Sequence, residues 1–148
     1  MRLSTKVRYG LRLMIDLALH DGKGLILLND IAKRQRISSK YLWQVISPLK
    51  TAKLVISGRG AKGGYRLARP AETITMKDIV TRLDDEFQPV ACLENPKTCK
   101  RSGGCAAQEL WCELGNKIAG FLESISLQEM AIRQLRKQGG ELDSMYFI

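Results

Sequence analysis

The fold of this chain is decided by residues 29–67, which read NDIAKRQRISSKYLWQVISPLKTAKLVISGRGAKGGYRL. Apolar residues at helical spacing predict a short helix over 29–36 and a second helix over 39–52. A glycine-rich segment then separates two short apolar runs, 54–57 and 65–68, which predicts a β-hairpin. A short helix, a tight turn, a second helix and a hairpin, in this order, predict a winged helix-turn-helix.

Local capping signals extend this prediction in both directions. Ser4 can cap a helix that runs to about residue 20, and Ser38 can cap the helix that begins at residue 39. Thr75 and Asp78 form a capping-box pattern ahead of a further apolar run. Pro48 stands inside the second helix and is expected to bend it or to weaken one turn.

A longer helix is predicted over residues 106–137, where apolar residues form one stripe: Leu110, Trp111, Leu114, Ile118, Phe121, Leu122, Ile125 and Met130. A single exposed helix must bury such a stripe, and a second copy of the chain can cover it. Gly139 and Gly140 are expected to end the helix. The predicted fold class is therefore mainly α with a small β-hairpin wing, a winged helix-turn-helix plus a long C-terminal dimerisation helix.

The predicted elements divide the chain into four segments. Residues 1–84 form a winged helix-turn-helix domain, 85–105 a cysteine loop, 106–137 the dimerisation helix and 138–148 a C-terminal tail. The loop has no hydrophobic periodicity and contains three of the four cysteines. It is longer than a connection without a function usually is, so we interpret it as functional.

Composition excludes several classes of protein. The chain has 148 residues, of which 45% are hydrophobic and 26% charged. These are ordinary globular values and argue against wholesale disorder. No apolar run approaches the ~18 residues of a membrane span, so we expect no membrane partner. The first residues lack the apolar stretch of a signal peptide, and we expect a cytoplasmic protein.

Charge is distributed unevenly along the chain. Residues 1–70 contain 15 Lys and Arg but 3 acidic residues, a net charge of +12, whereas residues 71–148 contain 9 against 12, a net charge of −3. Clustered basic residues are typical of a surface that contacts phosphates. The first half of the chain is therefore expected to bind double-stranded DNA.

The second helix and the wing supply the candidate DNA contacts: Ser39, Lys40, Tyr41, Gln44, Arg59, Lys62 and Gly63. The first residues of such a helix face base edges in the major groove, where Gln44 can pair with adenine. Arg59 stands on the wing and can enter a narrow minor groove. Tyr41 is expected to hold a phosphate or to pack the helix.

A family resemblance rests on an ordered set of short motifs: Met-Arg-Leu-Ser at 1–4, Arg8-Tyr9-Gly10, Asp30-Ile31-Ala32, Ile37-Ser38-x-x-Tyr41-Leu42, Leu54-Val55-x-Ser57, Arg59-Gly60-x-x-Gly63-Gly64-Tyr65-x-Leu67 and Ile74-Thr75-x-x-Asp78-Ile79-Val80. The chain resembles the IscR-type (Rrf-two) family of bacterial winged helix-turn-helix transcriptional regulators. The resemblance implies a homodimer on a palindromic operator. One departure is Trp43, where cluster-sensing relatives often have an acidic residue. We expect Trp43 to pack under the wing.

The cysteines have the pattern C-x6-C-x5-C-x6-C over Cys92, Cys99, Cys105 and Cys112, without the C-x2-C pair of zinc ribbons. Three of them lie in a polar, basic segment with Gly and Pro, which is no hydrophobic core. A structural role as buried thiols, or a structural zinc site, remains open at this point.

The resemblance implies that Cys92, Cys99 and Cys105 bind an iron–sulfur cluster. We favour a 2Fe–2S cluster, with a 4Fe–4S cluster as the alternative. Gln108 stands where similar relatives have a histidine, so the fourth ligand is open: Cys112, Gln108, Glu109, water or a group from the partner subunit. The one histidine, His20, is interpreted as a surface residue near a turn.

These inferences predict a dimeric DNA-binding transcriptional regulator, a repressor, controlled by an iron–sulfur cluster that senses iron, redox state or nitric oxide. The alternative is a cluster-free regulator of the same family that responds through cysteine oxidation or through binding of a sulfur-metabolism enzyme. No C-x-x-C pair, nucleotide-binding glycine pattern or catalytic triad pattern is present, so we expect no enzyme.

Overall fold

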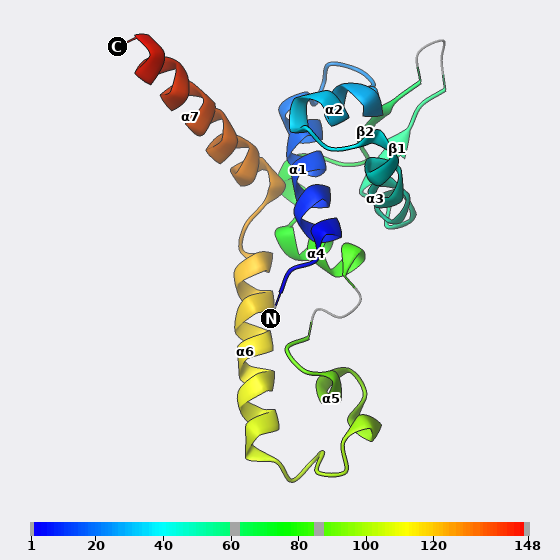
Figure 1. Cartoon of the computed structure of the whole chain (residues 1–148), viewed down its shortest axis with the longest axis vertical. Helices are drawn as coiled ribbons and strands as arrows, with labels where there is room; N and C mark the ends of the chain where they lie inside the picture. The colour runs from blue at the N-terminus through cyan, green and yellow to red at the C-terminus, as the bar shows by residue number, and fades with distance from the viewer. Residues whose placement is uncertain (1, 60–62, 85–87, 147–148) are drawn as a thin grey trace.

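A computed structural model describes residues 2–59, 63–84 and 88–146, and its elements follow one another as predicted for a mainly α chain with a small wing (Figure 1). The bounds are α1 (Thr5–Leu19), α2 (Leu28–Gln35), α3 (Ser39–Thr51), β1 (Val55–Ser57), β2 (Tyr65–Leu67), η1 (Ala71–Thr73), α4 (Met76–Leu83), α5 (Ala91–Glu94), η2 (Pro96–Thr98), α6 (Ala106–Glu123) and α7 (Leu127–Tyr146). The predicted winged helix fold is therefore confirmed.

The predicted helix starts are built as the sequence indicates. The Ser4 side chain accepts a hydrogen bond from the Val7 amide, and Ser38 accepts one from the Tyr41 amide. Thr75 and Asp78 form the reciprocal capping box of α4. Each cap satisfies an amide that has no partner inside its helix. The helix α3 continues through Pro48 to Thr51.

One hydrophobic core holds the N-terminal unit, which we define as residues 5–83 without the wing tip at 60–62. In α3 and α4 the apolar residues that recur at helical spacing are all buried: Leu42, Val45, Ile46, Leu49, Met76, Ile79, Val80 and Leu83. In α1, helical spacing predicts a buried stripe of Val7, Leu11, Met14, Ile15, Ala18 and Leu19, and this prediction is only partly correct. Leu13 and Leu17 are also fully buried, whereas Leu11 and Ile15 are only half-buried. The reason is that α1 packs against α3, α4 and α7, so more than one stripe is covered.

The wing is a two-stranded antiparallel sheet in which Val55 pairs with Leu67 and Ser57 with Tyr65. Ile26, in the segment before α2, adds an antiparallel bridge to Tyr65, through backbone hydrogen bonds of 2.9 and 2.8 Å. The base of the wing is therefore tied to the segment that leads into α2, and the helix-turn-helix and the wing form one packed unit.

The single helix predicted over 106–137 is wrong, because two helices, α6 and α7, occupy this region. Ser124 Oγ donates to the Phe121 carbonyl and Ser126 Oγ accepts from the Glu129 amide, so the two serines end one helix and begin the next. The predicted stop at Gly139 and Gly140 is also wrong, since α7 runs to Tyr146. A glycine inside a helix costs only about 1 kcal/mol relative to Ala, which does not oblige a helix to end.

The break between α6 and α7 has a tertiary cause. The Met76 amide donates to the Ile125 carbonyl (2.9 Å), and the Leu127 amide donates to the Ile74 carbonyl (2.8 Å). Ile125 and Leu127 are buried in the N-terminal core. These backbone bonds replace intrahelical ones, so the linker is pinned to the start of α4.

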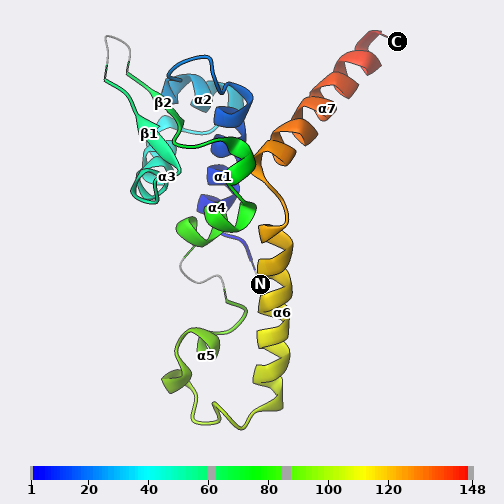
Figure 2. The same cartoon turned by 180° about the vertical axis from the view of Figure 1, so that it is seen from behind.

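Seen from both sides, α6 extends away from the N-terminal unit, and α6 and α7 lie on the side opposite the wing (Figures 1 and 2). The short helix α5 lies beside α6, with which it is in contact. Among the described helices, none is both long enough and apolar enough to cross a membrane.

Candidate nucleic-acid interface and cysteine loop

The exposed face of α3 is formed by Lys40, Trp43, Gln44 and Ser47. The last three follow Lys40 by three, four and seven residues and therefore lie on the same side of the helix. Ser39 is half-buried, and its hydroxyl donates to the Asn29 side-chain oxygen of α2 at 2.9 Å. The start of α3 is thus tied to the start of α2, and Lys40 and Gln44 are left free to contact a ligand.

Tyr41 takes the packing role that the sequence left open. It is half-buried against the core, and its ring meets the Tyr9 ring of α1 edge-on at a centroid distance of 5.3 Å. Arg8 and Arg12 lie over the same Tyr9 ring, at 5.9 and 5.6 Å from its centroid. Two cations of α1 are therefore held beside the N-terminal half of α3.

The wing contributes an exposed arginine and a glycine-dependent turn. Arg59 is exposed, while Lys62 lies outside the described residues. Gly63 and Gly64 have φ values of 54° and 127°. A Cβ at Gly64 would stand 2.9 Å from the Ile26 carbonyl oxygen, closer than real Cβ atoms come. Glycine at this position is what allows the wing to approach the segment before α2.

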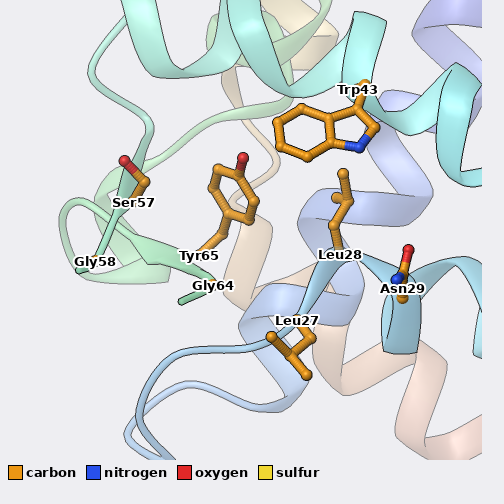
Figure 3. A pocket seen from close by; sticks show the side chains of 8 residues that line it. All are labelled: Leu27, Leu28, Asn29, Trp43, Ser57, Gly58, Gly64 and Tyr65. Atoms are coloured by element: carbon orange, nitrogen blue, oxygen red, sulfur yellow. The ribbon is translucent and has the colours of Figure 1, made fainter. Parts of the chain in front are cut away.

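Trp43 contacts the wing but is not packed beneath it as expected. Its ring meets the buried Tyr65 ring edge-on at 6.2 Å, and 57% of the residue remains exposed. Burial raises the pKa of the Tyr65 phenol above its ordinary value. The indole borders a pocket of about 340 Å³ between α2, α3 and the wing (Figure 3). Leu27 and Leu28 form its apolar side, and Asn29 stands at its rim (Figure 3).

A buried carboxylate fixes α2 against α1. Asp16 is 1% exposed and accepts two hydrogen bonds from Arg34, at 3.0 and 2.6 Å, and one from Gln35 at 3.0 Å. The hydrogen bond to Asp16 raises the pKa of Arg34 above its ordinary value. His20, expected on the surface, is half-buried, and its Nδ1 donates to the Asp16 carbonyl at 2.8 Å. This network holds the first helix of the helix-turn-helix in place.

The cysteines are spread over the loop and the first turns of α6. Cys92 and Cys105 are half-buried, Cys99 and Cys112 are exposed, and all four are free thiols. Cys105 is the residue that precedes the first turn of α6. The loop itself contains α5 and η2, two short helical turns that the sequence did not predict.

Gln108 ties the cysteine loop, described over residues 88–105, to α6. Its Nε2 donates to the Cys92 carbonyl (3.3 Å) and to Ser102 Oγ (3.0 Å), and its Oε1 accepts from the Gly103 amide (3.1 Å). One side chain thus joins both halves of the loop. Gly115, nearly two turns further along α6, lies against Gln88 and Pro89 at the start of the loop.

The chemistry of the loop fits an iron–sulfur cluster, because thiolates are the ligands of such clusters. The thiols of the loop are not gathered at one point in this structure. Within residues 2–59, 63–84 and 88–146, no three His, Cys, Asp or Glu side chains are gathered closely enough to hold a metal ion. The amide of Gln108 is engaged in the loop contacts rather than turned to a thiol. Cluster ligation would therefore require the loop to contract around its thiols.

The helix α6 carries a large uncovered apolar surface. None of its residues is buried, and Leu110, Trp111, Leu114 and Phe121 are between 37% and 64% exposed. On α7, Ile132 and Leu135 are 42% and 56% exposed. Cys112 and Asn116 project from the side of α6 away from Leu110, Leu114 and Phe121, as helical spacing requires.

Two features of these sites escaped the sequence. Leu27 and Asn29 line the pocket beside α3, and Ile26 pairs with the wing next to them, a pairing that no local pattern indicates. The loop contacts of Gln108 likewise depend on where the chain folds back. The candidate contacts Lys40, Gln44 and Arg59 are all exposed, and Ser39 and Tyr41 are tied to neighbouring helices.

Comparison with known proteins identifies the family. Residues 3–133 match the Rrf2 family model, described as an iron-dependent transcriptional regulator. The transcriptional regulator IscR of Photorhabdus laumondii is 39% identical over 90% of this chain and 81% of its own length.

Two solved structures are similar throughout. The structure of CymR, described as the global cysteine regulator of B. subtilis, has a TM-score of 0.75 and 38% identity, covering 90% of this chain and 98% of that one. The structure of T. potens IscR has a TM-score of 0.75 and 36% identity, covering 90% and 88%. The chain therefore belongs to the Rrf2 family of DNA-binding transcriptional regulators. The predicted resemblance is confirmed, as is the prediction that the chain is not an enzyme.

Proposed function

We propose that this Rrf2-family regulator binds a palindromic operator as a homodimer and that Cys92, Cys99 and Cys105 control the binding by holding an iron–sulfur cluster. The observation that carries the proposal is the junction between two parts of the chain. The cysteine loop is fastened to α6 by Gln108, and α6 is fastened to the DNA-reading unit by the backbone bonds at Ile125 and Leu127.

Support for DNA binding comes from α3 and the wing. Lys40 and Gln44 are exposed on one face of α3, and Arg59 is exposed on the wing. A helix of this kind fits the major groove, and a wing fits the neighbouring minor groove. Gln44 pairs with a base edge, while Lys40 and Arg59 supply charge toward phosphates and the narrow groove.

Support for the homodimer comes from the uncovered apolar face of α6. Leu110, Leu114 and Phe121 share this face and are 55%, 37% and 64% exposed. Burying a fully exposed side chain of this size is favourable by roughly 1.5–3 kcal/mol, and each of these residues would gain about the share of that free energy that its exposed fraction represents. A symmetric partner presents the same face. Two copies paired through α6 place two wings and two α3 helices on the two halves of a palindrome.

A few contacts connect the thiols of the loop to the DNA-reading helix. A change in the loop that alters its contacts with Gln108 acts on α6, and α6 leads into the linker pinned to Ile74 and Met76. These residues open α4, which packs against α1 and α3. A ligand of the loop shifts operator affinity by the difference in its binding to the two arrangements.

A second candidate is supported by a specific observation. The four thiols are free and ungathered in the described residues, and CymR, a cysteine regulator by description, is as similar as IscR. In this case the same loop acts through oxidation of its thiols or through a bound partner, without a cluster. The route from the loop to α3 is the same.

The deciding experiment is anaerobic purification followed by visible spectroscopy, iron and sulfide assays and operator binding. We expect a coloured protein with about two iron and two sulfide per chain for a 2Fe–2S cluster, or about four of each for a 4Fe–4S cluster. Cys92→Ser, Cys99→Ser and Cys105→Ser should each lose the colour and change operator affinity. Cys112→Ser is the matched control on α6, and loss of colour in that variant would identify Cys112 as the fourth ligand.

A colourless protein that stays colourless after reconstitution with iron and sulfide would overturn the cluster. Operator affinity that then changes with peroxide, but not in the three loop variants, would support the second candidate. Affinity indifferent to iron, peroxide and the three substitutions would remove the cysteine loop from the mechanism altogether.

A further inference from the structure

Trp43 is an exposed aromatic residue among polar neighbours on α3. It is 57% exposed, more than any other large hydrophobic residue of α1 to α4 in the part of the chain that the structure describes. The other residues of that face, Lys40, Gln44 and Ser47, are polar or charged. A ligand that covers the exposed part of this indole gains free energy from the apolar area removed from water.

The orientation of the indole is set by the wing. Its edge contact with Tyr65, at 6.2 Å and an interplanar angle of 81°, holds the ring over the pocket formed with Leu27 and Leu28 (Figure 3). Tyr65 is itself anchored by the two backbone bonds to Ile26. The indole is therefore a preorganised apolar surface, and the pocket of about 340 Å³ stays open beside it.

From this arrangement we propose that Trp43 reads the 5-methyl group of a thymine in the major groove of the operator. The inference rests on the proposed function, namely that α3 binds DNA. Trp43 neighbours Gln44 in sequence and on the α3 surface, so a duplex that places a base edge on Gln44 also covers the indole. The thymine methyl is the one apolar group that base pairs present in the major groove.

The charge around Trp43 favours nucleic acid over another protein as the occupant. The N-terminal 70 residues have a net charge of +12, and Lys40 lies one turn from the indole on the same face. A polyanion with an apolar group in its groove matches this surface, and an apolar protein segment does not.

The test compares thymine with uracil, which differ by that methyl group alone. DNA sites are first selected from a random duplex library with the wild-type protein. The best site is then resynthesised with deoxyuridine in place of each thymidine in turn, and affinities are measured by fluorescence anisotropy. We expect one symmetric pair of positions at which the loss of the methyl weakens binding about three- to tenfold.

Two variants assign that effect. In Trp43→Ala the thymine and uracil duplexes should bind equally, with overall affinity reduced. Gln44→Ala is the matched control on the same face and should keep the uracil penalty while losing discrimination at another base. Thermal unfolding of each variant checks that the fold is retained.

The outcomes separate the two proposals. Failure to select any site would contradict DNA reading by α3 and hence the proposed function. Selection of a site with no uracil-sensitive position, or the same uracil penalty in wild type and Trp43→Ala, would overturn the methyl-reading role while leaving DNA binding intact.

Discussion

The N-terminal unit and α6 differ in how far their apolar side chains are buried. The N-terminal unit encloses a continuous core in which Leu13, Leu42 and Ile79 are completely buried. The 18-residue helix α6 has no buried residue, although it carries Leu110, Trp111, Leu114 and Phe121. One chain thus contains a region whose apolar residues are covered by the same chain and a region whose apolar residues are not.

The contrast shows which region depends on other molecules. The N-terminal unit packs around a core made mostly of its own residues, with Ile125 and Leu127 added from the same chain, so it should keep its fold whether or not the chain dimerises. The helix α6 gains little packing within the chain, so its state should follow what binds it: the cysteine loop on one side and a second copy on the other. Three changes test this division.

The largest effect is expected from charging the apolar face of α6. Leu114→Glu combined with Phe121→Glu should convert the proposed dimer to a monomer, because the buried carboxylates would face their copies without partners. A monomer holds one half-site alone, and operator affinity should fall by about 10²–10⁴-fold. Light scattering and anisotropy measure the two effects.

Asn116→Glu is the matched control for this double variant. It adds a charge to the opposite side of α6, where Asn116 is exposed and its side chain makes a long contact with Cys112 Sγ at 3.9 Å. It should remain dimeric. A wild-type chain that is monomeric at micromolar concentration would contradict the division, because the apolar face would then be exposed for no reason.

A smaller effect is expected in the N-terminal unit, from Asp16→Ala. Arg34 and Gln35 would lose the buried carboxylate that holds α2 against α1. We expect the free energy of unfolding to fall by about 2–3 kcal/mol, since charged hydrogen bonds are lost in a buried place. Urea unfolding followed by circular dichroism measures the change.

The proposed dimer should survive the Asp16→Ala substitution at concentrations where the fold is retained, because the side-chain hydrogen bonds of Asp16 go to α2 and to no described residue of α6. Exposed Asp21→Ala serves as the comparison on the neighbouring turn, with an effect within about 0.5 kcal/mol. Equal destabilisation by both substitutions would show that the Asp16 network is not a stabilising unit.

The smallest effect is expected from Gln108→Ala. Three hydrogen bonds between the loop and α6 would be lost, each worth about 0.5–1.5 kcal/mol and all of them partly exposed to water. Global stability should change by about 1 kcal/mol or less, because the loop is outside the N-terminal core. In the wild-type chain the Gly103 amide donates to Gln108 Oε1. The rate of hydrogen exchange at this amide should therefore rise about tenfold in the variant.

Exchange at Gly103 that is unchanged in Gln108→Ala would mean that Gln108 does not fasten the loop. Gln108→Glu provides the finer comparison. It keeps the acceptor for the Gly103 amide but removes the donor to the Cys92 carbonyl and Ser102 Oγ, so protection of the Gly103 amide should persist.

Much of the N-terminal unit could be predicted because its signals are local. The caps at Ser4, Ser38 and Thr75 act over three residues, and the buried residues of α3 and α4 follow helical periodicity. The same local reasoning failed at residues 124–126. Nothing within four residues of Ile125 indicates that its carbonyl will accept a bond from Met76, about 50 positions earlier in the chain.

The candidate site divides in the same way. The exposure of Lys40, Gln44 and Arg59 follows from the turn and helix that the sequence predicts. The placement of Trp43 does not follow from the sequence, because its surroundings include Leu27, Leu28 and Tyr65, which come from other segments of the chain. Gln108, proposed from the resemblance as a candidate ligand, has a set of loop contacts that no spacing indicated.

The sequence by itself determined the winged helix-turn-helix, its helix starts and the basic charge of its first half. Only the tertiary structure decided where the long C-terminal region breaks, which side chain fastens the cysteine loop and what surrounds the exposed indole. The physical reason is the distance along the chain between the residues that interact. Backbone periodicity and capping are set by neighbours within a few residues, whereas these three features depend on hydrogen bonds and ring contacts between segments that meet only when the chain has folded.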